Sequence, residues 1–188
     1  MKILTVTGYK PMELNIFKPN DKKIAIIKEA IKNRLISYIE EGLEWVLVSG
    51  QMGVELWTGE VILDLKEEYD IKLGIIPPFE NHDQRWPEHY QAISQELSML
   101  ADFHQPLYRD EYKGPYQFKA RDKWLIEKSE ACLVLLDEEY PGSTRFFLQE
   151  AKKAVERNTY ASYTLTPFDL EETVQELMEQ DPNYWNND

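Results

Sequence analysis

The feature that most constrains the fold is a regular alternation between short, apolar, β-rich runs and longer segments with helical periodicity. The β-rich runs cover residues 3–7, 45–49, 71–76, 103–108, 131–136 and 161–165. The segment between the first two runs has apolar residues at three- and four-residue spacing, at Ile24, Ile27, Ile31, Leu35 and Ile39. This spacing puts them on one face of a helix. Strands that alternate with helices five times over predict parallel βαβ units.

The helical segments are expected at residues 21–41, 53–69, 87–100, 116–128, 144–157 and 169–178. The runs 45–49 and 131–136 are apolar on both faces, as central strands of a parallel sheet are. We therefore predict an α/β fold of three layers, in which helices flank a mostly parallel central sheet. Ligands of such sheets bind beyond the carboxyl ends of the strands. The loops that directly follow the strands are thus the candidate site.

The length and charge of the chain narrow the functional classes. The 188 residues are expected to form one domain over 1–180, with an acidic tail at 181–188. Lys and Arg number 21 against 34 Asp and Glu, a net charge of −13. Because nucleic acid and anionic membranes both attract positive surfaces, this balance disfavours extended nucleic acid and membrane as partners.

The single cysteine, Cys132, can form neither an internal disulfide nor a cysteine metal site, and a reducing cytoplasmic location is expected. Neither a signal peptide nor a membrane-spanning segment is expected, because no apolar run is long enough for either. His82, His89 and His104 lack a spacing typical of metal ligands, so neither a metal nor a cofactor is expected.

Two loops after predicted strands carry glycines and lead toward helices. Gly8 and Lys10 follow the first strand, where they offer a close backbone approach and a charge, or simply a tight turn with a surface lysine. Gly50 and Gly53 follow the second strand and directly precede a helix, where free N–H groups and the helix dipole suit an anion. This loop is neither a Walker loop nor a full Gly-x-Gly-x-x-Gly motif.

Glu55 lies in the first turn of that helix and has two readings. The carboxylate either stabilises the helix dipole, or it accepts hydrogen bonds from ribose hydroxyls or acts as an acid/base. Phe79, after the third strand, either stacks on a base or packs its loop.

The only locally basic stretch surrounds Arg121, with Lys119 and Lys123 beside it. These side chains either reach a phosphate or form a solvated helix face. Residues 142–144, Gly-Ser-Thr, open the helix after the fifth strand and form either a second anion loop or a plain N-cap.

The stretches 7–14 (TGYKPMEL) and 49–57 (SGQMGVELW) and the pair Pro78-Phe79 closely resemble the YpsA-like family of Gram-positive bacteria. That family is grouped with the SLOG superfamily of DprA/Smf and LOG proteins. The resemblance implies a Rossmann-like fold that binds nucleotides or nucleotide-derived sugars. With the loop residues above, the expected ligand-binding set is Gly8, Tyr9, Lys10, Gly50, Gln51, Gly53, Glu55, Trp57, Phe79, Arg121, Gly142, Ser143 and Thr144.

Two departures from the superfamily pattern bear on function. LOG hydrolases carry a glutamate three residues after the threonine of the second loop, and Phe147 stands there in this chain. Phenylalanine cannot act as acid, base or nucleophile. DprA-like proteins bind single-stranded DNA through basic surfaces, which an acidic chain disfavours.

We therefore expect a protein that binds a small phosphorylated nucleotide or nucleotide-sugar. The resemblance implies a sensor or regulatory role linked to cell division or stress, with protein partners in cell division. One alternative is a hydrolase of N-glycosidic or phosphate-ester bonds with Glu55 as the catalytic acid/base. A third reading is an interaction module with a vestigial pocket. Whether residues 77–116 form a lid is left open.

The basic residues expected to flank the pocket are Lys10, Lys119, Arg121, Lys123 and Arg145. They predict a small positive well on a negative body, which would favour a compact phosphate ligand over a polyanion.

Overall fold

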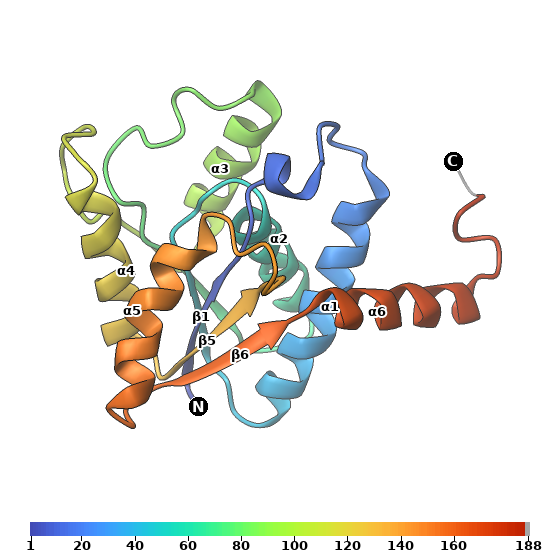
Figure 1. The fold of residues 1–188 in the computed structure, drawn as a ribbon. Coiled ribbons are helices and arrows are strands. Elements are labelled where there is room, and N and C mark those ends of the chain that lie inside the picture. The colour runs from blue at the N-terminus through green and yellow to red at the C-terminus, as the bar shows by residue number, and fades with distance from the viewer. Residues whose placement is uncertain (187–188) are drawn as a thin grey trace.

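The structure is a computed structural model and describes residues 1–186 of the chain. Its centre is a six-stranded sheet in the order β4-β3-β2-β1-β5-β6, and every pairing is parallel (Figure 1). The strands are β1 (Ile3–Thr7), β2 (Trp45–Val48), β3 (Lys72–Ile75), β4 (Phe103–His104), β5 (Ala131–Leu135) and β6 (Ala161–Leu165).

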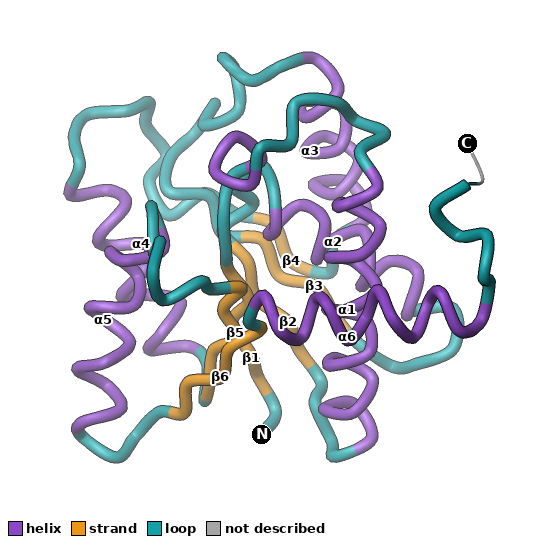
Figure 2. The backbone as a smooth tube through the Cα atoms, turned by 45° about the vertical axis from the view of Figure 1, so that its right-hand side comes forward, coloured by secondary structure: helices purple, strands orange, loops and turns teal. Residues whose placement is uncertain are grey.

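Helices cover both faces of this sheet. They are α1 (Lys22–Glu40), α2 (Val54–Leu65), α3 (Glu88–Leu100), α4 (Tyr116–Lys128), α5 (Thr144–Glu156) and α6 (Pro167–Gln180), with a short 3₁₀ helix, η1 (Pro11–Leu14). Figure 2 shows α4 and α5 on one side of the strands and α1, α2 and α3 on the other. The predicted three-layer α/β fold is confirmed.

Each layer of helices has its own hydrophobic core, because strand side chains alternate between the two faces. In β5, Leu133 and Leu135 pack into the core beneath α1 and α2, whereas Cys132 and Val134 pack into the core beneath α4 and α5. All four side chains are buried. This two-sided burial explains why the run shows no polar alternation in the sequence.

The predicted strand at 103–108 is shorter in the structure. Only Phe103 and His104 pair with β3, and Tyr108 makes an isolated parallel bridge to Phe79. Pro106 lies between these pairings and has no N–H group to donate to a ladder, which accounts for the interruption. Residues 77–116 thus contain α3, β4 and the connecting loops.

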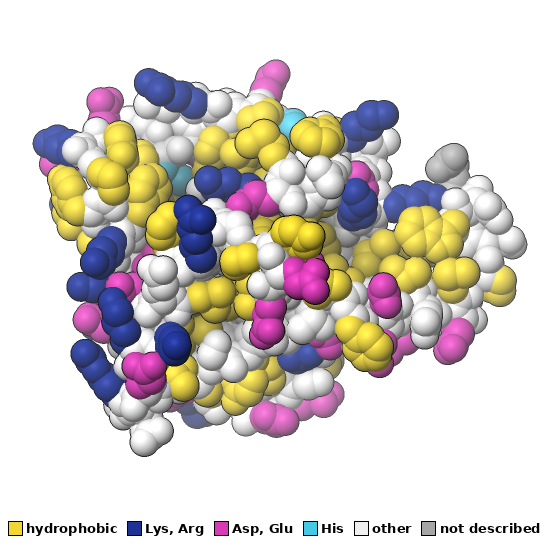
Figure 3. All heavy atoms as spheres, in the orientation of Figure 1, with side chains coloured by type: hydrophobic (Ala, Val, Ile, Leu, Met, Phe, Trp, Pro, Cys, Tyr) yellow, Lys and Arg dark blue, Asp and Glu magenta, His cyan; other side chains and the backbone are white. Residues whose placement is uncertain are grey.

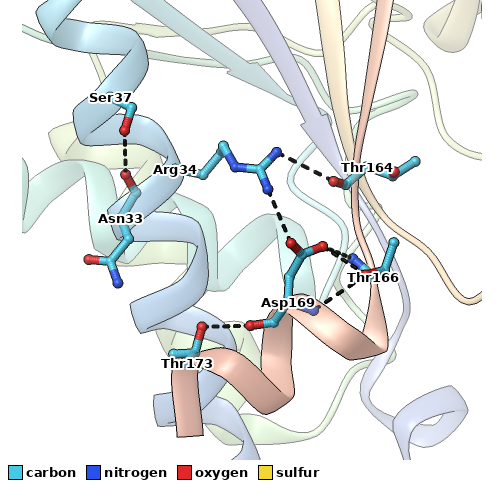
Figure 4. Close-up of polar contacts among 7 residues, drawn as sticks. All are labelled: Asn33, Arg34, Ser37, Thr164, Thr166, Asp169 and Thr173. Carbon is cyan, nitrogen blue, oxygen red and sulfur yellow. Dashed lines mark hydrogen bonds and ion pairs between the residues drawn. The ribbon is translucent and has the colours of Figure 1, made fainter. Parts of the chain in front are cut away.

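The C-terminal helix α6 is fixed to α1 at its start (Figure 4). The Arg34 guanidinium on α1 donates to the Thr164 carbonyl at 3.4 Å and pairs with Asp169 at 3.4 Å. Thr166 caps α6 and exchanges hydrogen bonds with Asp169. Farther along, α6 extends away from the sheet (Figure 1).

The acidic tail expected at 181–188 is described up to residue 186, and residues 187–188 lie outside the described part. The carbonyl of Trp185 accepts a hydrogen bond from Lys22 at 2.8 Å, so this segment returns to the start of α1. Within residues 1–186, no helix has both the length and the apolar character needed to cross a bilayer.

Candidate functional site

The sheet changes direction beside β1. From β1 the chain builds outward through β2, β3 and β4, and then crosses back to place β5 on the other side of β1. In an open α/β sheet such a switch point leaves a crevice at the carboxyl ends of the strands. A cavity of about 490 Å³ lies there, bounded by the loops after β1 and β2 and by α4 and α5. This volume is in the usual range for small-molecule sites.

Seven of the predicted binding residues line this cavity: Gly8, Lys10, Gln51, Glu55, Arg121, Ser143 and Thr144. The switch point therefore brings together residues from both glycine loops and from the basic stretch. Six others do not line it: Tyr9, Gly50, Gly53, Trp57, Phe79 and Gly142.

Glu55 is a buried carboxylate in the cavity wall and is only 6% exposed. One oxygen accepts from the Ser49 backbone N–H at 2.6 Å, and the other accepts from the Thr7 hydroxyl at 3.3 Å. Burial raises the pKa of this carboxyl, while the nearby Arg121 charge works in the opposite direction. The group thus has the surroundings of an acid/base and also those of a hydrogen-bond acceptor.

Arg121 lies beside a second buried carboxylate, Asp122. Its Nε and Nη2 atoms donate to Asp122 Oδ1 at 2.9 and 2.7 Å, and its guanidinium lies 5.4 Å from the centre of the Phe118 ring. Burial raises the pKa of Asp122 against the effect of Arg121. Much of the arginine charge is therefore already neutralised. Lys10 and Lys119 also line the cavity, and neither makes an ion pair with another described residue.

The predicted anion loop at the start of α5 holds an anion that belongs to the chain itself. The Glu13 carboxylate accepts from the Ser143 N–H, from the Ser143 hydroxyl and from the Lys10 N–H, each at 2.8 Å. Burial raises the pKa of Glu13, but these hydrogen bonds and Lys10 outweigh it and leave the pKa lowered. Gly142, with φ +53°, has no room for a Cβ, which would lie 2.7 Å from Glu13 Oε1.

Tyr9 and Gly53 join the loops instead of lining the cavity. The Tyr9 hydroxyl accepts from the Asp137 N–H at 2.8 Å and donates to the Tyr140 carbonyl at 2.7 Å, which ties the loop after β1 to the loop after β5. Gly53 has φ +97°, and a Cβ there would lie 2.4 Å from the Tyr9 carbonyl oxygen. A glycine is therefore required at position 53, because any side chain there would prevent the close packing of this loop on the backbone of Tyr9.

The aromatic residues considered for base contact pack within the protein. Trp57 is 1% exposed and belongs to the core beneath α1 and α2. Phe79 is buried and contacts the rings of Tyr112 and Phe118, with centroids 5.4 and 5.6 Å away. Because Phe118 lines the cavity, Phe79 supports that wall from behind. Gly50, with φ +79°, packs against Ile75, where a Cβ would lie 2.9 Å from the side chain.

The structure adds cavity residues that the sequence reasoning did not assign to a ligand. The principal ones are Ser49, Asp122, Phe118, Leu125, Phe146 and Phe147. Two of them could have been predicted from the sequence. Ser49 is the first polar residue after an apolar strand, and Asp122 is adjacent to Arg121. The phenylalanines come from successive helices and give the cavity an apolar wall.

Three of the five basic residues expected around the pocket line it: Lys10, Lys119 and Arg121. Lys123 and Arg145 are exposed and lie outside the lining, although the Arg145 guanidinium is 4.8 Å from the ring centre of Phe146, which does line it. Figure 3 shows Lys and Arg side chains gathered over α4 and α5. Within residues 1–186, no group of three or more His, Cys, Asp or Glu residues is arranged to hold a metal ion.

A parallel sheet that reverses beside its first strand, with a cavity at that point, defines a Rossmann-like α/β protein. The family model YpsA, described as the YspA SLOG family, matches residues 4–170. The chain therefore belongs to the YpsA family of SLOG proteins, as the resemblance of its loops predicted.

Close relatives span the whole chain. A UPF0398 protein of Oceanobacillus iheyensis is 55% identical over 185 residues, covering 98% of this chain and 100% of its own. The UPF0398 protein YpsA of Bacillus subtilis is 45% identical over 177 residues, covering 94% and 98%.

Solved structures share the fold at low identity. DNA processing protein A of Helicobacter pylori, whose structure is described with a single-stranded DNA binding mode, has a TM-score of 0.54 at 11% identity and covers 95% of this chain and 81% of its own. DprA of Streptococcus pneumoniae has a TM-score of 0.53 at 12% identity, with 96% of this chain and 56% of its own covered. These likenesses concern the fold alone.

Proposed function

We propose that this protein binds a small phosphorylated nucleotide or nucleotide-derived sugar in the switch-point cavity and does not turn it over. The observation that carries the proposal is the composition of the cavity wall. The buried Ser49 and Glu55 give the cavity a polar floor, Phe118 and Phe147 contribute apolar rings, and the less buried Lys10 and Lys119 lie at its border. A nucleotide has the matching parts, since its sugar is polar, its base is flat and apolar-faced, and its phosphate is anionic.

The distribution of charge supports a compact ligand. Lys10 and Lys119 line the cavity without a direct ion pair to another described residue, although Glu55, Asp122 and Glu150 also line it, and the chain as a whole carries −13. A phosphate in the cavity meets these positive charges at short range, whereas a polyanion would also have to lie against negative surface.

Calorimetry with AMP, GMP, CMP, UMP, ADP-ribose and NAD tests the proposal. Lys119→Ala should weaken binding of any phosphorylated compound that the wild type binds by about fivefold to tenfold, because it removes a charge-assisted contact. Lys32→Ala is the matched control, since it changes the net charge equally at an exposed position on α1. Absence of binding to the wild type, or equal weakening by both variants, would contradict the proposal.

A second candidate function is hydrolysis of an N-glycosidic or phosphate-ester bond. It is favoured by Glu55, because a buried carboxyl with a raised pKa in a cavity is a typical general acid. Against it, the LOG-type glutamate position holds Phe147, which is buried in the same wall. Chromatography of the incubated compounds separates the two functions. Release of free base or phosphate that is lost in Glu55→Gln would establish the hydrolase.

Binding without turnover would suit a sensor. We therefore extend the proposal to a regulatory role in cell division or stress, in which the occupied cavity changes affinity for a protein partner. Its test is capture of partners from a bacterial lysate with and without the bound nucleotide, using Lys119→Ala as the control. Identical capture under all conditions would remove the regulatory part of the proposal.

A further inference from the structure

The cavity floor contains a polar group that the protein itself leaves unused. The Ser49 side chain is 2% exposed and lines the cavity, and its hydroxyl oxygen has no hydrogen-bond partner. Within residues 1–186, the Ser49 hydroxyl oxygen is the only buried side-chain nitrogen or oxygen that lacks a hydrogen-bond partner. A buried hydroxyl without a partner destabilises the fold, so its presence calls for an explanation.

Other buried serines of this protein are fully bonded. The Ser129 hydroxyl donates to the Leu125 carbonyl at 2.7 Å and also lies within hydrogen-bond distance of the Thr5 and Tyr160 hydroxyls. The Ser94 hydroxyl donates to Asp83 at 2.7 Å. Ser49 differs from both because its hydroxyl oxygen has no partner within the protein, and it lines the switch-point cavity, where a ligand atom can supply one.

Ser49 lies next to acceptors that also have capacity left. Its backbone N–H donates to Glu55 Oε1, and the Thr7 hydroxyl donates to Oε2. Each carboxylate oxygen therefore has one bond from the protein and can accept another. The Ser49 hydroxyl is oriented closely enough toward Glu55 to lower the pKa of that carboxyl as a weak donor, but the contact does not reach the geometry of a regular hydrogen bond.

This arrangement matches a pair of neighbouring hydroxyls. One hydroxyl of a sugar can donate to Glu55, and the next can exchange a hydrogen bond with Ser49. A phosphate does not match, because it has no proton to give Glu55 and its charge is repelled by the carboxylate. The anionic end of a ligand is instead directed toward Lys10 and Lys119 at the cavity border.

We propose that Ser49 is a ligand-contacting residue which, together with Glu55, binds the ribose hydroxyls of the ligand and so selects ribonucleotides over deoxyribonucleotides. This inference rests on the proposed nucleotide-binding function. It adds a specificity-determining residue and fixes the direction in which the ligand lies, with its sugar on the floor and its phosphate at the border.

The test compares the four ribonucleoside monophosphates with their 2′-deoxy and 3′-deoxy counterparts by calorimetry. The wild type should bind the best ribonucleotide about tenfold more tightly than at least one deoxy counterpart, because the deoxy compound leaves a buried polar group unpaired. In Ser49→Ala the preference for the ribonucleotide over its deoxy counterpart should fall from about tenfold to about twofold or less. The main cause should be weaker binding of the ribonucleotide.

Ser49→Ala removes an unpartnered oxygen, so its melting temperature without ligand should be equal to or above that of the wild type. Ser129→Ala is the matched control. It breaks existing hydrogen bonds outside the cavity and should lower the melting temperature while leaving the ribose preference unchanged.

The two levels of the proposal fail in different ways. If no nucleotide binds to the wild type, the nucleotide-binding function is overturned and this inference falls with it. If ribonucleotides bind but the ribose preference is absent, or is as large in Ser49→Ala as in the wild type, only the role of Ser49 is overturned.

Discussion

Glu55 lines the cavity, whereas Glu13 bonds to two of the lining residues, Lys10 and Ser143, and the two carboxylates experience opposite electrostatic conditions. Glu55 is buried with two donors, and burial raises its pKa above the ordinary value of 4.5. Burial also raises the pKa of Glu13, but three hydrogen-bond donors and the Lys10 charge outweigh it and lower that pKa below 4.5. The same residue type therefore weakens the fold at neutral pH in one place and strengthens it in the other.

Glu55→Gln should change the pH dependence of stability. The folded protein holds the Glu55 proton to a higher pH than the unfolded chain, so wild-type stability falls as pH rises from about 4.5 through the raised folded pKa. Glutamine does not ionise; its Oε1 can accept from the Ser49 N–H, and its Nε2 can donate to the Thr7 hydroxyl oxygen, so the Thr7 bond reverses its direction. Urea unfolding from about pH 4.5 to about pH 8 should show the wild type losing stability relative to the variant. A constant difference across that range would contradict the assignment.

Glu13→Gln should destabilise the protein with the opposite pH profile. The lowered folded pKa means that the contribution of Glu13 is present above pH 4.5 and is lost as pH falls through the folded pKa. At neutral pH we expect a loss of about 1 kcal/mol, kept small because the residue is exposed. The difference from wild type should shrink in acid. Glu127→Gln, at an exposed position on α4, should have no such effect.

At the scale of elements, the start of α2 is held against the loop after β1. The Val54 N–H donates to the Tyr9 carbonyl at 3.1 Å, and Gly53 packs on that same carbonyl. The helix terminus that the sequence suggested as an anion site is thus partly used to join two loops.

Gly53→Ala should reduce stability strongly. Its positive φ is strained for alanine, and the added Cβ would lie 2.4 Å from the Tyr9 carbonyl oxygen and 3.0 Å from Lys10 Cα. We expect a loss of about 2–4 kcal/mol in chemical unfolding. Gly42→Ala shares a positive φ, +104°, but meets nothing within 4 Å, so it should cost only about 1 kcal/mol. Equal losses would show that the close contact at Gly53 is unimportant.

Much of this element structure follows from periodicity. The β-rich runs predict β1, β2, β5 and β6 to within a residue. In β2 and β5, which are buried parallel strands, no polar position interrupts the apolar pattern, whereas β6 is an edge strand with exposed positions at Ser162 and Tyr163. The strand predicted at 103–108 is cut to two residues, because Pro106 interrupts it and its pairing with β3 depends on tertiary register. The 3₁₀ helix η1 carries no periodic signal and was not predicted.

The site was predictable where it depends on chain topology and less so where it depends on side-chain direction. Glu55, Arg121 and Lys10 were assigned because loops after parallel strands converge. Trp57 belongs to the apolar stripe of α2, together with Val54 and Val61. Its burial in the core could therefore be predicted from the spacing of these residues. The contact of Glu13 with Ser143 joins residues 130 positions apart, and no local pattern reveals it.

At the scale of the whole molecule, the net charge of −13 predicts that this chain does not bind extended DNA. The basic side chains over α4 and α5 form a local group on an acidic body (Figure 3). Calorimetry or fluorescence anisotropy with a labelled oligothymidine should show no binding at physiological salt, because a strand would extend past this group. Salt-dependent binding that is lost in Lys123→Ala or Arg145→Ala would contradict this and would identify a nucleic-acid surface.

The contacts that tie the loop after β1 to the loop after β5 have a consequence for how the protein is made. They join residues 128 to 131 positions apart, through Tyr9 and Glu13 on one side and Asp137, Tyr140 and Ser143 on the other. During synthesis the ribosome delivers β1 to β4 first, and most of the cavity wall, from Pro115 to Glu150, is then still missing. Contacts of such long sequence separation form late and slowly. The cavity therefore cannot be complete until the chain has been made as far as Glu150 and its two halves have come together.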